Sequence, residues 1–289
     1  MSDKPEPTLD ALLPAEIAHR AEEIGVKKAG LDAPSTVVLA VLAGAFIALG
    51  AIFSTTVSAG TAGSLPFGVV RLLSGLVFSL GLILVIVGGA ELFTGNNLII
   101  MAWASRRVST RQLLRNWALV YGGNLIGAVS TAALVFVGGQ YQFGRGAVGN
   151  AALDIASAKV HLGFLEGVVL GILCNALVCL AVWLSYGARS TTDKILAIVP
   201  PIAAFVAAGF EHSIANMYFL PVALLIRAGA PEAFWNAIGK TAHDYPDLTW
   251  TNAVVANLVP VTLGNIIGGV LLVGGVYWFV FLRKKTPAP

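Results

Sequence analysis

The sequence predicts an all-α integral membrane protein with six transmembrane helices. Hydrophobic residues make up 57% of its 289 residues and charged residues only 11%, against about 25% charged residues in an average soluble domain. A soluble fold of this size needs a charged exterior, and 18 Lys and Arg with 15 Asp and Glu residues cannot cover one. The 32 glycines fit membrane helices, because small residues let helix backbones pack closely.

Six segments are long and apolar enough to cross a bilayer, which requires about 20 residues each. They run approximately over residues 35–59, 67–104, 113–138, 162–186, 195–226 and 249–282. The second and fifth are too long for one straight span and contain polar residues or prolines near their middle. These interruptions are Glu91, Thr94, Gly95, Asn96 and Asn97 in the second, and Pro200, Pro201, Glu211, His212, Ser213 and Asn216 in the fifth. We therefore expect two broken helices within a transmembrane channel domain over 35–282.

A short motif recurs in the third and sixth segments, as GNLIG at 123–127 and GNIIG at 264–268. The recurrence predicts two repeats of three spans, over about 35–138 and 162–282. Because each repeat has an odd number of spans, the halves would be inverted, an arrangement that places broken helices and binding sites near the membrane midplane. The alternative is a coincidence of helix-packing chemistry, since small-residue patterns are common in membrane helices.

Positive charge is distributed unequally between the two sides of this predicted domain. Thirteen of the 18 Lys and Arg residues fall on the side of both termini. Because cytoplasmic loops carry the excess of Lys and Arg, we expect both termini in the cytoplasm and a multi-pass protein of a bacterial-type cytoplasmic (inner) membrane. Segment 1–34 has apolar positions at helical spacing and no signal peptide, which favours a helix lying against the cytoplasmic mouth over a movable lid. Residues 283–289 would form a cytoplasmic tail.

Ionisable side chains inside spans are costly and are therefore candidates for function. His212 is the most informative, because imidazole ionises near neutral pH and can hold or release a proton; the alternative is a histidine hydrogen-bonded for packing. Glu91 and Glu211 lie beside the breaks, where they can accept hydrogen bonds from unpaired backbone N–H groups, so we expect them to support the loops. Thr94 and Asn175 are neutral groups that could orient a small polar solute or bond between helices.

Catalytic motifs are absent from the sequence. It lacks a Walker A loop, a dinucleotide-binding glycine motif, a zinc-protease motif and a recognisable Ser-His-Asp set, so we expect no enzyme, no ATP-driven pump and no cofactor. Cys174 and Cys179 turn to different sides of a helix, which predicts packing residues rather than a metal site. The Lys and Arg clusters between spans indicate topology, not nucleic-acid binding.

Four ordered segments carry a family resemblance. They are GAELFT at 89–94, GILCNALVCLAVW at 171–183, GFEHSIANM at 209–217 and PVTLGNIIGG at 260–269. Together they resemble the formate/nitrite transporter family over nearly the whole chain. The resemblance implies an aquaporin-like six-helix protomer that assembles as a homopentamer, with one pathway through each subunit.

The resemblance also implies roles for individual residues. His212 would be the central histidine, with Thr94 as its partner on the interrupting loop and Asn175 facing the central vestibule. Glu211 would be the carboxylate beside the histidine, and Lys159 would draw anions into the outer mouth. The apolar constrictions would come from Phe78, Leu82, Leu92, Val178 and Phe205. One departure is Asn96-Asn97, where formate channels carry smaller hydroxyl and β-branched residues; it bears on loop gating and substrate preference.

The expected function is bidirectional formate transport across the lipid bilayer, with pH-dependent proton coupling through His212. A bare carboxylate would lose much of its hydration energy in an apolar constriction, whereas the neutral acid would lose far less. Nitrite, hydrosulfide, acetate and lactate are alternative substrates within the same family. A neutral-solute channel of aquaporin type is less favoured, because the sequence lacks paired Asn-Pro-Ala motifs.

Overall fold

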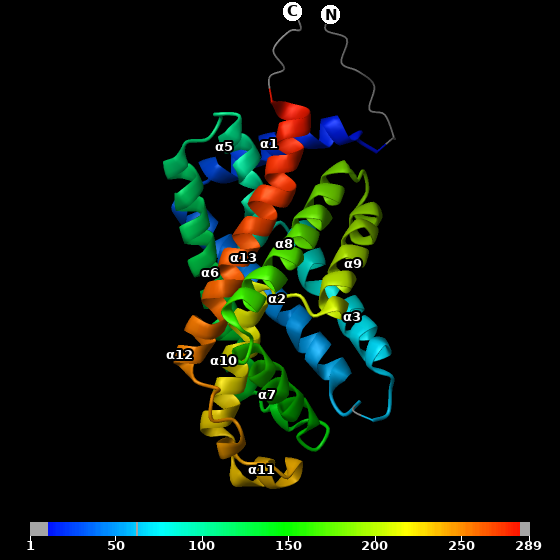
Figure 1. Ribbon diagram of the computed structural model, residues 1–289, viewed down its shortest axis with the longest axis vertical. Helices are drawn as coiled ribbons and strands as arrows, with labels where there is room; N and C mark the ends of the chain where they lie inside the picture. The colour runs from blue at the N-terminus through cyan, green and yellow to red at the C-terminus, as the bar shows by residue number, and fades with distance from the viewer. Residues whose placement is uncertain (1–10, 62, 284–289) are drawn as a thin grey trace, which may run out of the picture.

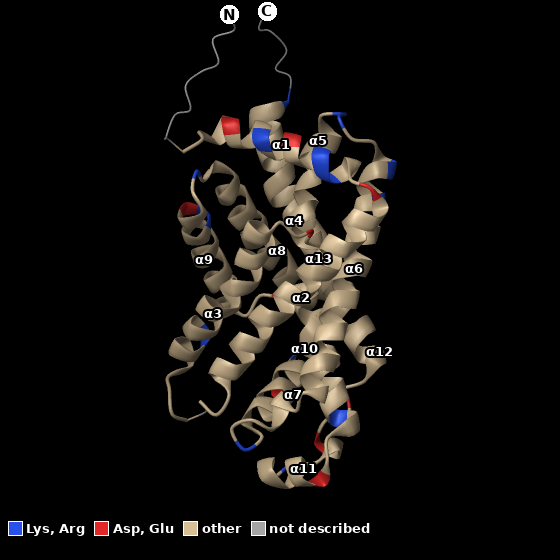
Figure 2. Cartoon of the chain, turned by 180° about the vertical axis from the view of Figure 1, so that it is seen from behind, with Lys and Arg blue, Asp and Glu red and all other residues tan. Residues whose placement is uncertain are grey.

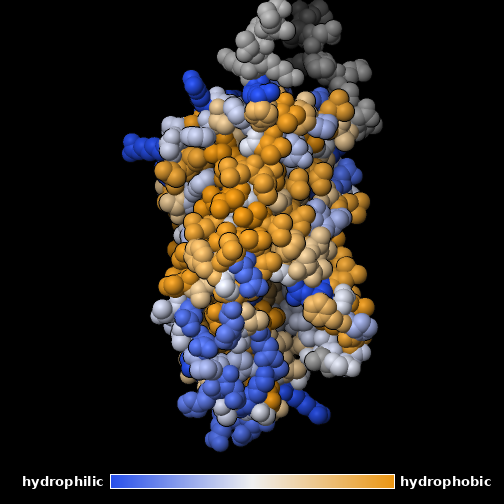
Figure 3. All heavy atoms as spheres, viewed as in Figure 1, coloured by the Kyte–Doolittle hydropathy of each residue, from blue (hydrophilic) through white to orange (hydrophobic). Residues whose placement is uncertain are grey.

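The computed structural model describes residues 11–61 and 63–283, which form a bundle of helices (Figure 1). Six helical runs in this part of the chain are long and apolar enough to cross a membrane, as predicted. They are α2 (Ala33–Ser58), α3 (Phe67–Gly88), α6 (Thr110–Val137), α8 (Phe164–Gly187), α9 (Thr191–Ala208) and the continuous run Trp250–Leu282. Lys, Arg, Asp and Glu gather toward the two ends of the molecule (Figure 2), and apolar side chains cover the middle of the face seen in Figure 3.

The remaining helices are shorter or lie outside these spans. α1 (Pro14–Gly30) lies across the end of the bundle where the last span ends, and α7 (Ala147–Val160) and α11 (Glu232–Ile238) lie toward the opposite end (Figure 1). The last span consists of α12 (Trp250–Asn252), the π-helical η4 (Ala253–Leu258), α13 (Val259–Ile267) and the π-helical η5 (Gly268–Gly275) and η6 (Trp278–Leu282). Short 3₁₀ turns are η2 (Gln140–Gln142) and η3 (Ala242–Asp244).

Both overlong segments are interrupted by unwound backbone. α3 ends at Gly89, whose φ of 83° is the left-handed conformation that glycine adopts most readily at a helix end, and α9 ends in the same way at Gly209 (φ 79°). After the first break the chain continues as α4 (Phe93–Asn96), η1 (Asn97–Ile99) and α5 (Ile100–Ala104). After the second it continues as α10 (Ser213–Gly229).

The two prolines of the fifth segment do not mark its break. Pro200 and Pro201 lie inside α9, which continues for two further turns to Ala208. Proline removes a backbone donor, yet membrane helices tolerate it because neighbouring groups can satisfy the carbonyls that it frees. The interruption expected from these prolines is therefore wrong in position, and it is Gly209 that ends the helix.

Two sets of three helices pack in the same way. α2 packs against α3 and α6, while α8 packs against α9 and α13. The Gly-Asn motifs lie at equivalent contacts, because a Cβ on Gly127 of α6 would overlap the Val41 carbonyl oxygen and a Cβ on Gly268 would overlap the Ile172 carbonyl oxygen. Glycine is required at both places for the helix backbones to approach.

Candidate functional site

An asparagine of the first Gly-Asn motif holds the loop at the first break. Asn124 on α6 accepts a hydrogen bond from the Phe93 N–H (2.9 Å) and donates to the carbonyl oxygens of Ala40 (2.8 Å) and Glu91 (2.9 Å). Its side chain is fully buried. The bonds to Phe93 and Glu91 replace helical partners that the unwound backbone has lost, and the bond to Ala40 ties the loop to α2.

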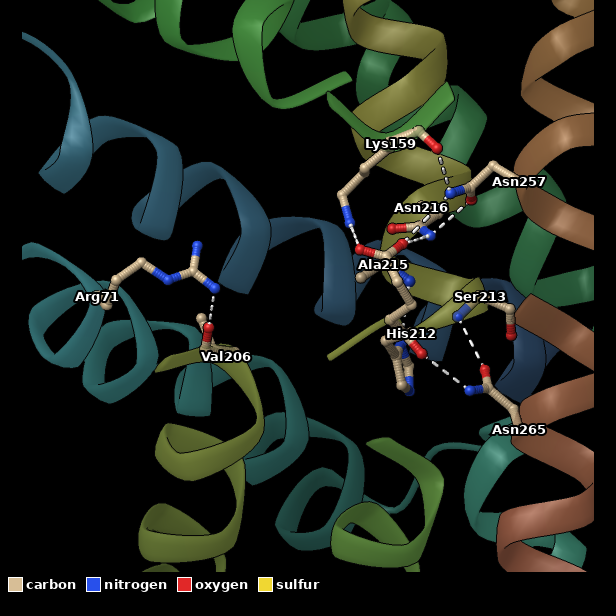
Figure 4. Close-up of polar contacts among 10 residues, drawn as sticks. Arg71, Lys159, Val206, His212, Ser213, Ala215, Asn216, Asn257 and Asn265 are labelled. Carbon is tan, nitrogen blue, oxygen red and sulfur yellow. Dashed lines mark hydrogen bonds and ion pairs between the residues drawn. The ribbon is translucent and has the colours of Figure 1, made fainter. Parts of the chain in front are cut away.

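The second motif repeats this arrangement at the second break. Asn265 on α13 accepts from the Ser213 N–H (2.9 Å) and donates to the carbonyl oxygens of Gly171 and Glu211 (2.9 Å each), as Figure 4 shows in part. The sequence repeat located both asparagines, and only the structure shows that they fix the loops.

The carboxylate of Glu91 is the centre of a buried polar network. It accepts hydrogen bonds from Lys28 Nζ of α1 (2.7 Å) and from Asn96 Nδ2 (2.6 Å). Asn96 Nδ2 also donates to Asn116 Oδ1 (3.0 Å), and Asn116 donates to the Lys28 carbonyl oxygen (3.2 Å). Asn96, one of the two residues that depart from the family pattern, is thus part of the loop support.

The carboxylate of Glu211 has the equivalent partners. It accepts from Lys159 Nζ of α7 (2.6 Å), from Asn216 Nδ2 (2.7 Å) and from Asn257 Nδ2 (3.3 Å). Asn257 also donates to the Lys159 carbonyl oxygen (3.0 Å), as Asn116 does to Lys28. The donors found for both carboxylates are Lys and Asn side chains, not the unpaired backbone N–H groups expected from the sequence. The loop-supporting role of the two glutamates stays a prediction.

The matched networks bring two further helices into the repeat. Lys28 on α1 and Lys159 on α7 make the same contacts to equivalent carboxylates, although the expected repeats, 35–138 and 162–282, exclude both helices. Periodicity could not find this match, because two surface-type lysines in otherwise dissimilar helices give no sequence signal. We therefore include α1 and α7 in the repeat units.

Two cavities open on either side of the central loops. The first, of about 240 Å³, is here called the α1 cavity and includes Lys28, Glu91 and Tyr186 in its wall. The second, of about 500 Å³, is called the α7 cavity and includes Arg71, Lys159 and Glu211. Lys159, predicted to draw anions, does line a cavity, but its charge lies 2.6 Å from the Glu211 carboxylate.

A small apolar chamber lies between these cavities. Its volume is about 10 Å³, close to the space that one water molecule needs. Its wall consists of Ile47, Phe78, Leu82, Leu92, Val178, Ile202, Phe205 and His212. All five residues predicted to form constrictions therefore meet around one chamber, with His212 as its polar member.

The chamber shares its walls with the cavities in two groups. Leu82 and Leu92 also line the α1 cavity, whereas Phe78 and Phe205 also line the α7 cavity. The two phenylalanine rings contact edge to face with centroids 5.7 Å apart. An apolar pair thus borders the chamber on the side of each cavity. The chamber has room for about one water molecule and is too small for a hydrated ion.

His212 has a defined hydrogen-bonding state. It is the N-cap of α10, and its Nδ1 accepts the Ala215 N–H (3.1 Å). Because Nδ1 uses its lone pair there, a neutral ring carries its proton on Nε2. Nε2–H then donates to Thr94 Oγ1 (3.0 Å), so the structure joins the predicted pair across the two broken spans.

Asn175 is fully buried and does not line any of the three cavities described above. Its Nδ2 is within hydrogen-bond distance of the carbonyl oxygens of Asn265 (2.7 Å) and Thr94 (3.3 Å) and of Asn97 Oδ1 (2.9 Å). Asn97, the second departure from the family pattern, also donates to the Phe93 carbonyl oxygen (3.2 Å). These contacts favour loop support for Asn175, not the substrate-facing position that the resemblance implied.

The similarity of this chain to known proteins agrees with this geometry. The sequence profile described as "Formate/nitrite transporter" matches residues 15–279. The chain belongs to the formate/nitrite transporter family. Family members in this comparison include the formate channel FocA of Escherichia coli K12, 48% identical over 98% of this chain and 99% of the relative, and FocA of Haemophilus influenzae, 41% identical over 96% and 95%.

Two solved structures of the formate/nitrite transporter type share the fold. One, described as a pentameric formate channel with formate bound, has a TM-score of 0.83 and 45% identity and covers 87% of this chain and 98% of its own. Another, an FNT family ion channel, has a TM-score of 0.77 and 29% identity over 92% and 98%. This protein is therefore an all-helical membrane protein with the fold of these channels.

Proposed function

We propose that this protein conducts formate in both directions across a bacterial inner membrane, with both termini in the cytoplasm. The observation that carries the proposal is the apolar chamber between two polar cavities, with the His212–Thr94 hydrogen bond as its polar contact. The relatives described as formate channels, over nearly the full chain, support formate as the substrate. The pentameric relative supports a homopentamer with one such chamber in each subunit.

The chamber favours a species that carries little charge. A carboxylate moved from water into apolar surroundings loses hydration energy that its new neighbours do not replace. A hydrogen bond from Nε2–H or from the Thr94 hydroxyl compensates in part, because bonds to a charged acceptor are the strong ones. A proton on the carboxylate removes the charge itself.

Proton transfer has a specific structural requirement here. In the neutral ring, Nε2–H can share its proton with a formate oxygen but cannot release it. Release requires an imidazolium, and that in turn requires protonation at Nδ1 and loss of the bond from the Ala215 N–H. The Nε2 proton then passes to a carboxylate oxygen, forming neutral formic acid and leaving the ring protonated at Nδ1.

Coupling should follow the acidity on each side of the membrane. Formic acid, with a carboxyl pKa of about 4, is almost wholly ionised at neutral pH, so its diffusion through lipid alone is limited. Import from an acidic exterior would therefore carry formate together with a proton, and export from a neutral cytoplasm would carry the anion.

His212→Phe tests this proposal. Formate flux in proteoliposomes should fall, and its dependence on pH should disappear, because phenylalanine fills the chamber without a proton site. Wild-type protein without formate flux would reject formate transport, while a variant with unchanged flux and unchanged pH dependence would reject the role of His212. Nitrite, hydrosulfide, acetate and lactate, assayed in the same liposomes, test the alternative substrates.

A further inference from the structure

Arg71 is a charged side chain within a span that the site described above does not use. It lies in the second turn of α3, is partly buried and lines the α7 cavity together with Phe78, Phe205 and His212. A long arginine side chain near a helix end can reach the membrane interface, so it is the contacts of Arg71, rather than its position, that bear on function.

The end of α9 holds the guanidinium in place. Arg71 donates from Nε to the Ala207 carbonyl oxygen (3.2 Å) and from Nη2 to the Val206 carbonyl oxygen. Both carbonyls belong to the last turn of α9, where the helix dipole is negative. The Val206 carbonyl also accepts the Gly209 N–H (3.1 Å). The side chain therefore reaches the cavity with its orientation fixed, and Figure 4 shows it extending from α3 toward the region of Lys159 and His212.

One edge of the guanidinium remains available. The two carbonyls occupy the edge formed by Nε and Nη2. The edge formed by Nη1 and the second N–H of Nη2 has no hydrogen-bond partner among residues 11–61 and 63–283. This edge presents two parallel N–H donors, the arrangement that matches the two oxygens of a carboxylate.

Arg71 also supplies the less compensated positive charge of the α7 cavity. Lys159 is paired with Glu211 at 2.6 Å, and Asp154 is paired with Lys240 at 2.8 Å. In the described part of the chain, no carboxylate lies within ion-pair distance of Arg71. Glu211 lies near enough to interact with Arg71 electrostatically but makes its close ion pair with Lys159. Arg71 is therefore the less compensated of the two cations in this cavity.

We propose that Arg71 binds the carboxylate of the substrate in the α7 cavity, before the substrate passes Phe78 and Phe205 to reach His212. This inference rests on the proposed transport of formate. The ligand is a small monovalent carboxylate that accepts two hydrogen bonds from the Nη1/Nη2 edge. The hydrogen bonds from Arg71 to the carbonyls of α9 hold the Nη1/Nη2 edge in the orientation that this carboxylate requires.

The test compares formate uptake from the two sides of the membrane. Initial rates are measured against formate concentration in right-side-out and inside-out vesicles, for wild type, Arg71→Gln, Arg71→Lys and Arg145→Gln. Arg145 is an exposed arginine of the loop before α7. Arg145→Gln therefore removes the same charge at a position outside the cavity wall. Gel filtration checks that each variant assembles as the wild type does.

Arg71→Gln should raise the half-saturating formate concentration about threefold to tenfold, as expected for loss of a partly buried charged contact, and only from the side of the α7 cavity. Arg71→Lys keeps the charge but lacks the paired donors, and should recover less than half of this loss. Arg145→Gln should match the wild type.

Three results would overturn the inference. The half-saturating formate concentration of Arg71→Gln could equal that of the wild type, or that of Arg71→Lys could do so. It could also change equally for uptake from both sides, as it would if Arg71 merely capped α9. Wild-type vesicles without formate uptake would reject the proposed function itself and this inference with it. If Arg71→Gln does not assemble, the comparison of Arg71→Lys with wild type still decides between the two roles.

Discussion

Lys159→Met leaves the Glu211 carboxylate without its cation. The equivalent substitution in the other repeat, Lys28→Met, does the same to Glu91. Both lysines contact an equivalent glutamate, at 2.6 Å and 2.7 Å. The two side chains of the Lys159 pair are 14% and 7% exposed, against 23% and 8% for the Lys28 pair. Breaking the better-buried pair should lower the free energy of unfolding more, because less water reaches the carboxylate that is left.

The expected size follows from this burial. Removing one partner of a fully buried ion pair costs about 3–5 kcal/mol. Glu211 retains its hydrogen bonds from Asn216 and Asn257, and the cavity lets water reach the vacated position, so we expect Lys159→Met to lower the free energy of unfolding by about 2–4 kcal/mol. Lys28→Met, at the more exposed pair, should cost about 1–2 kcal/mol.

Denaturation of the purified protein in mixed micelles measures these differences. The double variant Lys159→Met/Glu211→Gln should recover about half of the loss, because the buried charge is then removed as well. A Lys159→Met protein as stable as the wild type, or a double variant less stable than the single one, would refute the reasoning that the ion pair stabilises the loop at the second break.

Two further predictions concern Thr94 and His161. Thr94→Val keeps the shape of the side chain but removes the acceptor of His212 Nε2–H, so formate flux in proteoliposomes should fall about tenfold, the equivalent of roughly 1.4 kcal/mol. Thr94→Ser, which keeps the hydroxyl, should retain most of the wild-type flux. Full activity of the valine variant would remove Thr94 from the pathway. Outside the spans, hydrogen bonds to the Ser157 carbonyl and the Asp247 carboxylate raise the pKa of His161. The contact therefore stabilises the fold fully below about pH 6.5 and is lost as pH rises through the higher folded pKa; melting curves of wild type and Asp247→Asn should differ at pH 5.5 and converge above neutral pH.

The sequence predicted those features of the fold that depend on short stretches of chain. The six spans follow from continuous apolar runs, and the left-handed Gly89 and Gly209 lie next to the polar residues that indicated the breaks. Proline is a strong local signal for a helix end, yet Pro200 and Pro201 lie inside α9, because the membrane and neighbouring helices allow this helix to continue.

Long-range partners could not be predicted in the same way. The partner of Glu91 is Lys28, which is 63 residues away, and nothing near Lys28 in the sequence distinguishes it from the adjacent Lys27. The residue type of Asn175 left open whether it orients a solute or bonds between helices, and the structure shows its amide in contact with the carbonyl oxygens of Asn265 and Thr94. The direction of a polar side chain depends on which helices surround it.

By itself, the sequence determined that this chain spans a membrane, that two of its spans are interrupted and that His212 and Thr94 lie at those interruptions. Burial in lipid imposes these features directly, since a polar group within an apolar run is costly and needs a partner or a function. The tertiary structure decided which charges are compensated. It pairs Lys28 and Lys159 with glutamates and leaves one edge of Arg71 open to the α7 cavity, because only helix packing brings α1 to the first loop, α7 to the second and α3 to the end of α9.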